Sequence, residues 1–191
     1  MKLLLHSCCG PCTVGTMEVL EKENIKPTIY WSNPNIHPLQ EYLQRRDCLK
    51  EYCEKEQLEL IVHDEYGLDD FCKSVGENLN TRCIEYCYPI RLKQTFEYAK
   101  ENGYDAVSTT LLYSIYQKHD YIKYLCEKYA KEYGIDFLYR DFRVCFWDGH
   151  EKAKELGLYM QKYCGCIFSE EESFIRKNAK ERTKRKWNKT I

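Results

Sequence analysis

The sequence predicts an α/β protein in which helices cover both faces of a parallel β-sheet. Short apolar runs alternate with longer amphipathic segments along the chain, and this alternation is typical of βαβ units. At 191 residues the chain is long enough for one domain with a substantial core, and no Gly-, Pro- or Ser-rich linker divides it. In such folds the crossovers are right-handed, and ligands bind at the carboxyl ends of the strands.

Five strands and their helices follow one another in the sequence. Apolar and β-branched runs predict strands over residues 2–6, 26–32, 58–65, 105–112 and 135–142. Helical periodicity predicts helices over residues 13–24, 39–56, 68–76, 117–134 and 149–157, with a further helix around 91–102. The segment GENLNTRC, residues 76–83, predicts a loop before that further helix.

Composition predicts a soluble cytoplasmic protein. The opening MKLLLH turns polar after five residues, so we expect no signal peptide, and no apolar run approaches the roughly 20 residues of a membrane helix. The 12 cysteines would suggest disulfides in a small secreted domain. In a longer chain without an export signal, clustered cysteines are more typical of metal ligands or redox catalysts.

The formal charge of −1 conceals an uneven distribution. Residues 174–191 hold eight basic side chains and one acidic one, a net charge of +7 that leaves −8 on the remainder. A charge run is most often a solvated helix end. Trp187 among the cations also favours nucleic acid, because its ring can stack on a base while lysine and arginine contact phosphates. We expect a single domain over 1–173 and a basic C-terminal arm over 174–191.

The motif HSCCGPC places three thiols directly after the first predicted strand. Gly10 and Pro11 predict a sharp, rigid bend there, in the first βα turn, where such folds commonly bind ligands. If the segment is extended, Cys8 and Cys9 point to opposite sides and could serve two different metal centres.

Two further cysteine pairs lie far away in the sequence. RCIEYC places Cys83 and Cys87 four residues apart, on one face of a helix, and YCGC places Cys164 and Cys166 on either side of a glycine. Six thiols exceed the four that a closed zinc site or a cubane iron–sulfur cluster uses, which leaves some for a second metal. We expect the five other cysteines to be buried packing residues rather than metal ligands: Cys48, Cys53, Cys72, Cys126 and Cys145.

Together these motifs resemble the cobalamin-independent epoxyqueuosine reductases, the QueH-type family. The matching segments are HSCCGPC, NPNIHPLQEYLQRR, RC with a following CY and Arg91, KENGYDAVSTTLLYSIYQKHDYI, DFR at 141–143 and LGLYMQKYCGC. They span about residues 3–169, almost all of the chain except the basic arm. Their order and number make the resemblance specific.

The resemblance implies a Rossmann-like domain of the adenine-nucleotide-hydrolase (HUP) type. It would hold a 4Fe-4S cluster beside a mononuclear iron and reduce epoxyqueuosine in tRNA to queuosine, the last step of queuosine biosynthesis. The implied metal ligands come from Cys8, Cys9, Cys83, Cys87, Cys164 and Cys166, with Cys12 as a further candidate for the lone iron. One departure is that relatives place two residues between the cysteines of the RC and CY element, whereas this chain has three.

Other residues are candidates for proton transfer and substrate contact. His119 follows the fourth predicted strand, and the ordinary histidine pKa of about 6.5 suits acid catalysis. His37, in a predicted loop, is a further candidate for substrate contact, whereas His6 predicts a core position. Candidate contacts to the RNA are Arg82, Arg91, Thr109, Thr110, Gln117, Arg143 and Lys162. The arginines could instead form ion pairs or pack within the protein. The threonines could be there only because threonine is favoured in β-strands.

Three rival functions remain at this point. An ATP-dependent tRNA-modifying enzyme would carry a Ser/Gly-rich phosphate loop where this chain has SCCGPC. A cysteine-rich electron-transfer protein and a tRNA-binding protein with a structural zinc or iron–sulfur site are the others. If the protein is a reductase, its partners are tRNA and an external low-potential electron donor. The sequence identifies neither the donor nor the oligomeric state.

Overall fold

The computed structural model describes the backbone of residues 1–187 and the side chains of residues 1–180, and it has the predicted α/β architecture. Its sheet has five parallel strands in the order β3-β2-β1-β4-β5. The strands are β1 (Leu3–His6), β2 (Thr28–Trp31), β3 (Leu60–Val62), β4 (Ala106–Thr109) and β5 (Asp136–Phe137). The fold class expected from the sequence is confirmed.

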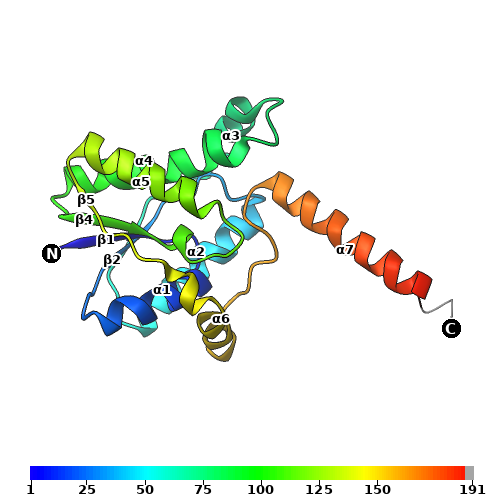
Figure 1. Cartoon of the computed structure of the whole chain (residues 1–191), viewed down its shortest axis with the longest axis horizontal. Helices are drawn as coiled ribbons and strands as arrows, with labels where there is room; N and C mark the ends of the chain where they lie inside the picture. Colours follow the sequence, from blue (N-terminus) through cyan, green and yellow to red (C-terminus); the bar gives the residue numbers. More distant parts are fainter. Residues whose placement is uncertain (188–191) are drawn as a thin grey trace.

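Helices lie on both faces of this sheet (Figure 1). On one side α1 packs against α2 and α6, and on the other side α4 packs against α5. The longer helices are α1 (Gly10–Lys22), α2 (Leu39–Lys55), α3 (Leu68–Val75), α4 (Tyr88–Glu101), α5 (His119–Tyr133), α6 (Phe146–Glu155) and α7 (Ile167–Trp187). Three short helical turns are η1 (Cys83–Cys87), η2 (Thr110–Leu112) and η3 (Phe142–Cys145).

The central strand β1 fixes the position of the core and of the site. Leu3, Leu4 and Leu5 are almost completely buried, as a strand covered by helices on both faces requires. The chain runs from β1 towards β2 and β3 on one side, while β4 and β5 lie on the other side. The strand order therefore reverses between β1 and β4, and the ends of these two strands form the switch point at which open α/β sheets bind ligands.

Element boundaries differ from the sequence prediction in three places. Helix α1 begins at Gly10, so that Gly10 and Pro11 are its first residues rather than a bend; proline is favoured in a first helical turn because its missing N–H has no intrahelical partner there. Strand β5 has only two residues, and α6 begins at Phe146. Helix α7 begins at Ile167, so it joins the end of the predicted domain to the basic arm without a break.

Helix α7 leaves the body of the domain and projects away from it (Figure 1). Phe174 and Ile175 on this helix are 64% and 57% exposed. Part of the predicted basic arm lies outside the described residues, including Lys189 and the side chains beyond Lys180. Within the described part of the chain, no helix has the length and apolar character needed to cross a membrane.

Candidate metal centre

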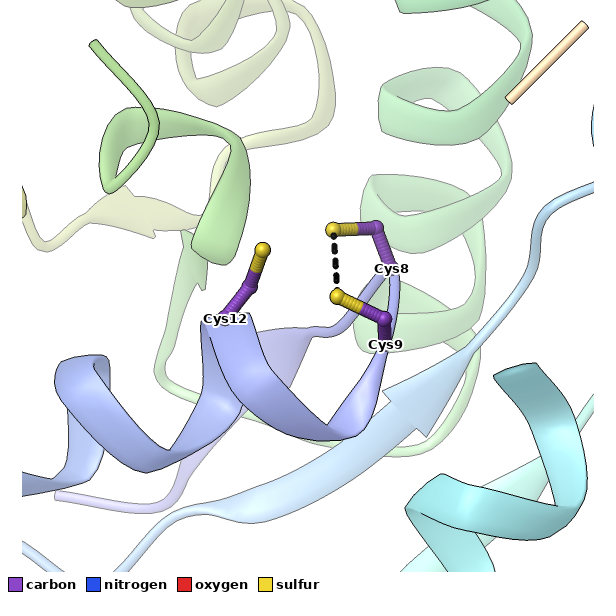
Figure 2. Close-up of side chains that lie close together, drawn as sticks. All are labelled: Cys8, Cys9 and Cys12. Carbon is purple, nitrogen blue, oxygen red and sulfur yellow. Dashed lines mark hydrogen bonds between the residues drawn. The ribbon is translucent and has the colours of Figure 1, made fainter. Parts of the chain in front are cut away.

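Cys8, Cys9 and Cys12 form one compact cluster, called here the N-terminal thiol group. Their three sulfurs lie within 4.8 Å of one another, and the Sγ atoms of Cys8 and Cys9 are 3.8 Å apart (Figure 2). All three side chains are buried. Sulfur ligands of one tetrahedral ion lie about 3.8 Å apart, given metal–sulfur bonds of about 2.3 Å. The spacing of this group therefore suits a metal ion or one corner of a cluster.

The structure corrects the expectation that Cys8 and Cys9 point to opposite sides. Strand β1 ends at His6, and Cys9 is already the N-cap residue of α1. The two cysteines thus lie in the turn between strand and helix, where the alternation of an extended strand no longer applies. Cys12 follows in the first turn of α1, so all three thiols point to the same place (Figure 2).

Hydrogen bonds within the N-terminal thiol group favour one thiolate. Hydrogen bonds with Cys12 and then Cys9 lower the pKa of Cys8 well below its usual value, and Thr110 adds to this effect. The Thr110 hydroxyl lies 3.5 Å from Cys8 Sγ and accepts a 3.1 Å hydrogen bond from the Cys8 backbone N–H. Burial raises the pKa of Cys9, and the bond with Cys8 raises that of Cys12. Cys8 is therefore poised as the thiolate, the form that binds metal.

A second cluster, the distal thiol group, consists of Cys83, Cys87 and Cys166. The thiol of Cys87 interacts with both of the others, although Cys166 is far away in the sequence. The interaction with Cys87 is the main reason why the pKa of Cys166 is lowered to about 5 and that of Cys83 to about 7. The same interactions raise the pKa of Cys87. This group also contains ionised sulfur.

The residue spacing between Cys83 and Cys87 has a structural explanation. Residues Cys83–Cys87 form a π-helical turn, η1, which continues directly into α4. A π turn accommodates one residue more than an α turn, and such turns are frequent at functional sites. The three residues between Cys83 and Cys87 thus lie within a single π turn. The predicted loop over 76–83 is correct only up to the start of this turn.

Arg82 contacts both the distal thiol group and helix α7. Its Nε lies 3.4 Å from Cys166 Sγ, and its Nη2 donates a 2.6 Å hydrogen bond to Glu172 Oε1 on α7. The side chain is buried beside Phe168, with the guanidinium 5.8 Å from the ring centre. Arg82 was a candidate RNA contact, but its guanidinium contacts the thiol of Cys166 and the carboxylate of Glu172, near the start of α7.

Arg45 of α2 anchors the loop that contains Cys164 and Cys166. Its two Nη atoms donate hydrogen bonds of 2.9 and 2.8 Å to the backbone carbonyls of Cys164 and Tyr163, and its Nε bonds to Glu41 at 2.7 Å. Arg45 is 1% exposed. A planar guanidinium can satisfy two carbonyls and a carboxylate at once, which a lysine cannot do. This buried network fixes the course of the loop.

Cys164 is exposed, unlike the thiols of the N-terminal thiol group. The Gln117 side chain donates to Cys164 Sγ at 3.3 Å and accepts a 2.7 Å hydrogen bond from Tyr88 Oη. The pKa of Cys164 is raised by desolvation of its thiol and by the nearby charge of Cys83. Gln117, a predicted substrate contact, is placed beside a candidate metal ligand.

Arg91 of α4 connects the thiol groups electrostatically. Its positive charge lowers the pKa of Cys8 in the N-terminal group and those of Cys83, Cys87 and Cys164. These four thiols therefore lie within electrostatic range of one buried charge. The convergence of the three sequence-distant cysteine segments on one metal centre stays a prediction. All 12 cysteines are free thiols, and none forms a disulfide.

The remaining candidates lie away from the sulfurs or behind them. His119 contacts Tyr139 at 3.2 Å, and burial lowers its pKa. The exposed Arg143 pairs with Asp141. Thr109 is fully buried, and its hydroxyl bonds to His6 Nδ1 at 2.9 Å.

Two histidines line the core rather than the site. His6 Nε2 bonds to the Ser32 carbonyl, which only accepts, so this nitrogen carries the proton; burial lowers the His6 pKa to about 4, and the expected core position is confirmed. His37 is fully buried against Tyr66 and Phe71 instead of lying in an open loop. Of the predicted packing cysteines, Cys72 is wrong, because it is exposed; the others are buried: Cys48, Cys53, Cys126 and Cys145.

Sequence reasoning missed three residues of the site. Arg45 and its partner Glu41 lie four residues apart in a helix, a spacing that also occurs in ordinary surface ion pairs. Gln161 donates to Cys12 Sγ at 3.6 Å. The available signal for Gln161 was its position two residues before the YCGC motif.

The fold and the thiol groups define an α/β protein with a cysteine-rich metal centre at the switch point of its sheet. Comparison with protein families identifies it further: the family model described as Epoxyqueuosine reductase QueH matches residues 3–172. The chain belongs to this family, and the resemblance drawn from its motifs is confirmed.

Individual relatives agree with this assignment. The chain is 38% identical over 178 residues to Epoxyqueuosine reductase QueH of Dehalococcoides mccartyi, covering 93% of this chain and 97% of that protein. It is 32% identical over 179 residues to the protein of the same name from Thermotoga maritima, covering 87% and 89% respectively.

A solved structure supports the fold independently. The U34-tRNA thiolase NcsA from Methanococcus maripaludis, determined with its [4Fe-4S] cluster, aligns over 95% of this chain and 67% of that chain with a TM-score of 0.50. The sequence identity is 16%, so this similarity concerns the fold alone.

Proposed function

We propose that this protein is an oxidoreductase that removes the epoxide oxygen of epoxyqueuosine in tRNA and yields queuosine. The three buried sulfurs of the N-terminal thiol group, within 4.8 Å of one another at the switch point of the sheet, carry the proposal. The reaction breaks both carbon–oxygen bonds of the epoxide and forms an alkene. It consumes two electrons and two protons, and the oxygen leaves as water. An external low-potential donor must supply the electrons.

The donor set fits a 4Fe-4S cluster together with a mononuclear iron. Seven thiols exceed the four ligands of one cubane. Their ionised members, and a buried arginine nitrogen without a hydrogen-bond partner, suit an anionic inorganic group. Cys8, Cys9 and Cys12 would hold one part of this centre, and Cys83, Cys87, Cys164 and Cys166 the other. When bound, these metals supply single electrons and a Lewis acid for the epoxide oxygen.

The protein residues orient this centre and exclude water from it. Thr110, Gln117 and Gln161 donate hydrogen bonds to Cys8, Cys164 and Cys12, and such contacts tune the basicity of metal ligands. Arg45 fixes the backbone of the loop that carries Cys164. Arg82 donates to the sulfur of Cys166.

Proton delivery is assigned to His119. It lies at the start of α5, two residues after Gln117, whose amide reaches Cys164. Its Nδ1 is buried without a partner, so it is free to bond to an incoming group. Cys12 is the second candidate, because its thiol is protonated beside the Cys8 thiolate. Comparing turnover of H119Q and C12S against pH separates the two assignments.

The substrate is an RNA base that must leave its stack to reach buried thiols, which favours the single-stranded anticodon loop. The domain over 1–173 would hold the site, and the basic arm over 174–191 would add sequence-independent attraction to phosphates. Arg143, on the exposed η3 turn, is the candidate contact closest to solvent. Removal of residues after Phe174 should weaken tRNA binding and flatten its salt dependence; unchanged binding would exclude the arm. We place the reaction in the cytoplasm, whose reducing conditions keep thiols free.

The direct test is single-turnover conversion of epoxyqueuosine-containing tRNA by anaerobically reconstituted protein with a chemical reductant. Formation of queuosine that depends on both iron and reductant supports the proposal. A protein that binds zinc, is colourless and leaves the epoxide intact would instead be a structural zinc protein. A protein with a cluster that exchanges electrons but never consumes the epoxide would be an electron-transfer protein.

A further inference from the structure

Three buried arginines lie at the thiol site: Arg45, Arg82 and Arg91. Of these, Arg91 has no carboxylate partner in the described part of the chain. Arg45 pairs with Glu41 at 2.7 Å, and Arg82 pairs with Glu172 at 2.6 Å. Arg91 is 3% exposed, and the hydrogen bond that its guanidinium makes is from Nε to the Cys87 carbonyl at 2.8 Å. Its Nη2 is buried without any partner.

A buried cation of this kind is costly unless an anion lies next to it. Burial also prevents Arg91 from reaching an RNA phosphate, the role that its position in the sequence suggested. Its hydrogen bond to the Cys87 carbonyl places Arg91 beside the distal thiol group, with the Tyr88 ring centre 5.9 Å from the guanidinium. The anion that Arg91 requires is therefore provided by the sulfurs themselves when they bind metal.

We infer that Arg91 is a positioning residue that supplies the fixed counter-charge for the metal-bound thiolates of the distal thiol group. This inference rests on the proposed function only in taking the thiols as metal ligands. It assigns to Arg91 no contact with RNA or epoxide. Its hydrogen bond to the Cys87 carbonyl holds the guanidinium at the start of α4, directly behind η1.

The role predicts that Arg91 contributes more to the metal-loaded protein than to the metal-free protein. In R91M the side chain keeps a similar length and loses its charge, while R91K retains the charge. The full chain, freed of metal under reducing anaerobic conditions, is titrated with Co²⁺, whose thiolate absorption reports ligation. We expect Co²⁺ affinity to fall about 10- to 100-fold in R91M, as for other residues that support metal ligands, and to stay within a few-fold of wild type in R91K.

Thermal unfolding separates this role from simple packing. The rise in melting temperature on Co²⁺ loading should shrink in R91M and be retained in R91K, whereas a packing role would lower both temperatures equally in R91M. The matched control is R140M, which removes an arginine that pairs with Glu23 outside both thiol groups. Its main effect should be a loss of stability in both states. Equal loss in both states for R91M, with unchanged Co²⁺ affinity, would overturn the inference.

The redox potential gives an independent readout in protein reconstituted with iron and sulfide. Because reduction adds negative charge, loss of a nearby cation should shift the midpoint potential of R91M to more negative values. An unchanged potential in R91M, with the cluster intact, contradicts the inference. If the wild-type protein forms no cluster at all, the proposed function fails, while the Co²⁺ titration still tests Arg91.

Discussion

The two thiol groups of this protein are built in opposite ways. The N-terminal thiol group lies within five consecutive residues, and one turn from β1 into α1 brings its sulfurs together. The distal thiol group joins η1 to the start of α7, two segments about 80 residues apart, which meet only in the folded chain. The first group depends on local backbone geometry, and the second on buried arginines. The two groups should therefore respond differently to mutation.

The largest effect should come from removing one thiol of each group. We expect C8A and C166A each to reduce turnover to the background rate, because each removes the sulfur that is ionised in its group. The measurement is queuosine formation in a single-turnover assay, with the visible spectrum of each variant. The control C126A removes a fully buried thiol outside both groups and should keep its spectrum. Wild-type turnover in C8A or C166A would refute the shared centre.

Removal of Arg45 should destabilise the part of the site that depends on buried arginines. R45M leaves Glu41 and two carbonyls of the cysteine loop without their partner, and breaking a buried pair costs about 3–5 kcal/mol. Denaturant unfolding of the metal-free chain measures this loss. R46M is the matched control, since Arg46 is more exposed and pairs with the half-exposed Asp47 and Asp64; its cost should stay below about 1 kcal/mol. Equal losses for the two variants would contradict the anchoring role.

A smaller effect is expected when one hydrogen bond to a thiol is removed. T110V deletes the hydroxyl beside Cys8 Sγ while keeping the shape of the side chain. We expect the pKa of Cys8 to rise, because its thiolate loses a donor. The rate of alkylation by iodoacetamide against pH measures this in the metal-free protein. T95V, on the far part of α4, also removes a buried hydroxyl and should leave the profile unchanged.

The smallest effect should follow from shortening the π turn. Deleting Glu85 restores a two-residue spacing between Cys83 and Cys87, which an ordinary α turn would again place on one face. We expect cluster content to stay within about two-fold of wild type. The measurement is iron per chain after reconstitution. Deleting Glu97 instead, within the regular part of α4, shifts the register of the helix and is the control expected to lose iron. Complete loss of iron in both variants would contradict the interpretation of η1.

The sequence was informative where structure depends on neighbours along the chain. The alternation of apolar and amphipathic segments predicted the sheet and its helices, and HSCCGPC predicted a thiol site after β1. The expected divergence of Cys8 and Cys9 was wrong, because the strand ends at His6 and the chain bends at Cys8. The roles of Arg45 and Arg91 could not be predicted, since a charged residue in a helix is normally exposed. Only the tertiary fold buries these two against sulfurs from other segments.

The central claim is that both thiol groups hold one iron–sulfur centre. The most direct test is the content of iron and acid-labile sulfide per chain in anaerobically purified wild-type protein. We predict about four sulfides and more than four irons per chain. Protein that contains zinc and no labile sulfide after anaerobic reconstitution would contradict the claim.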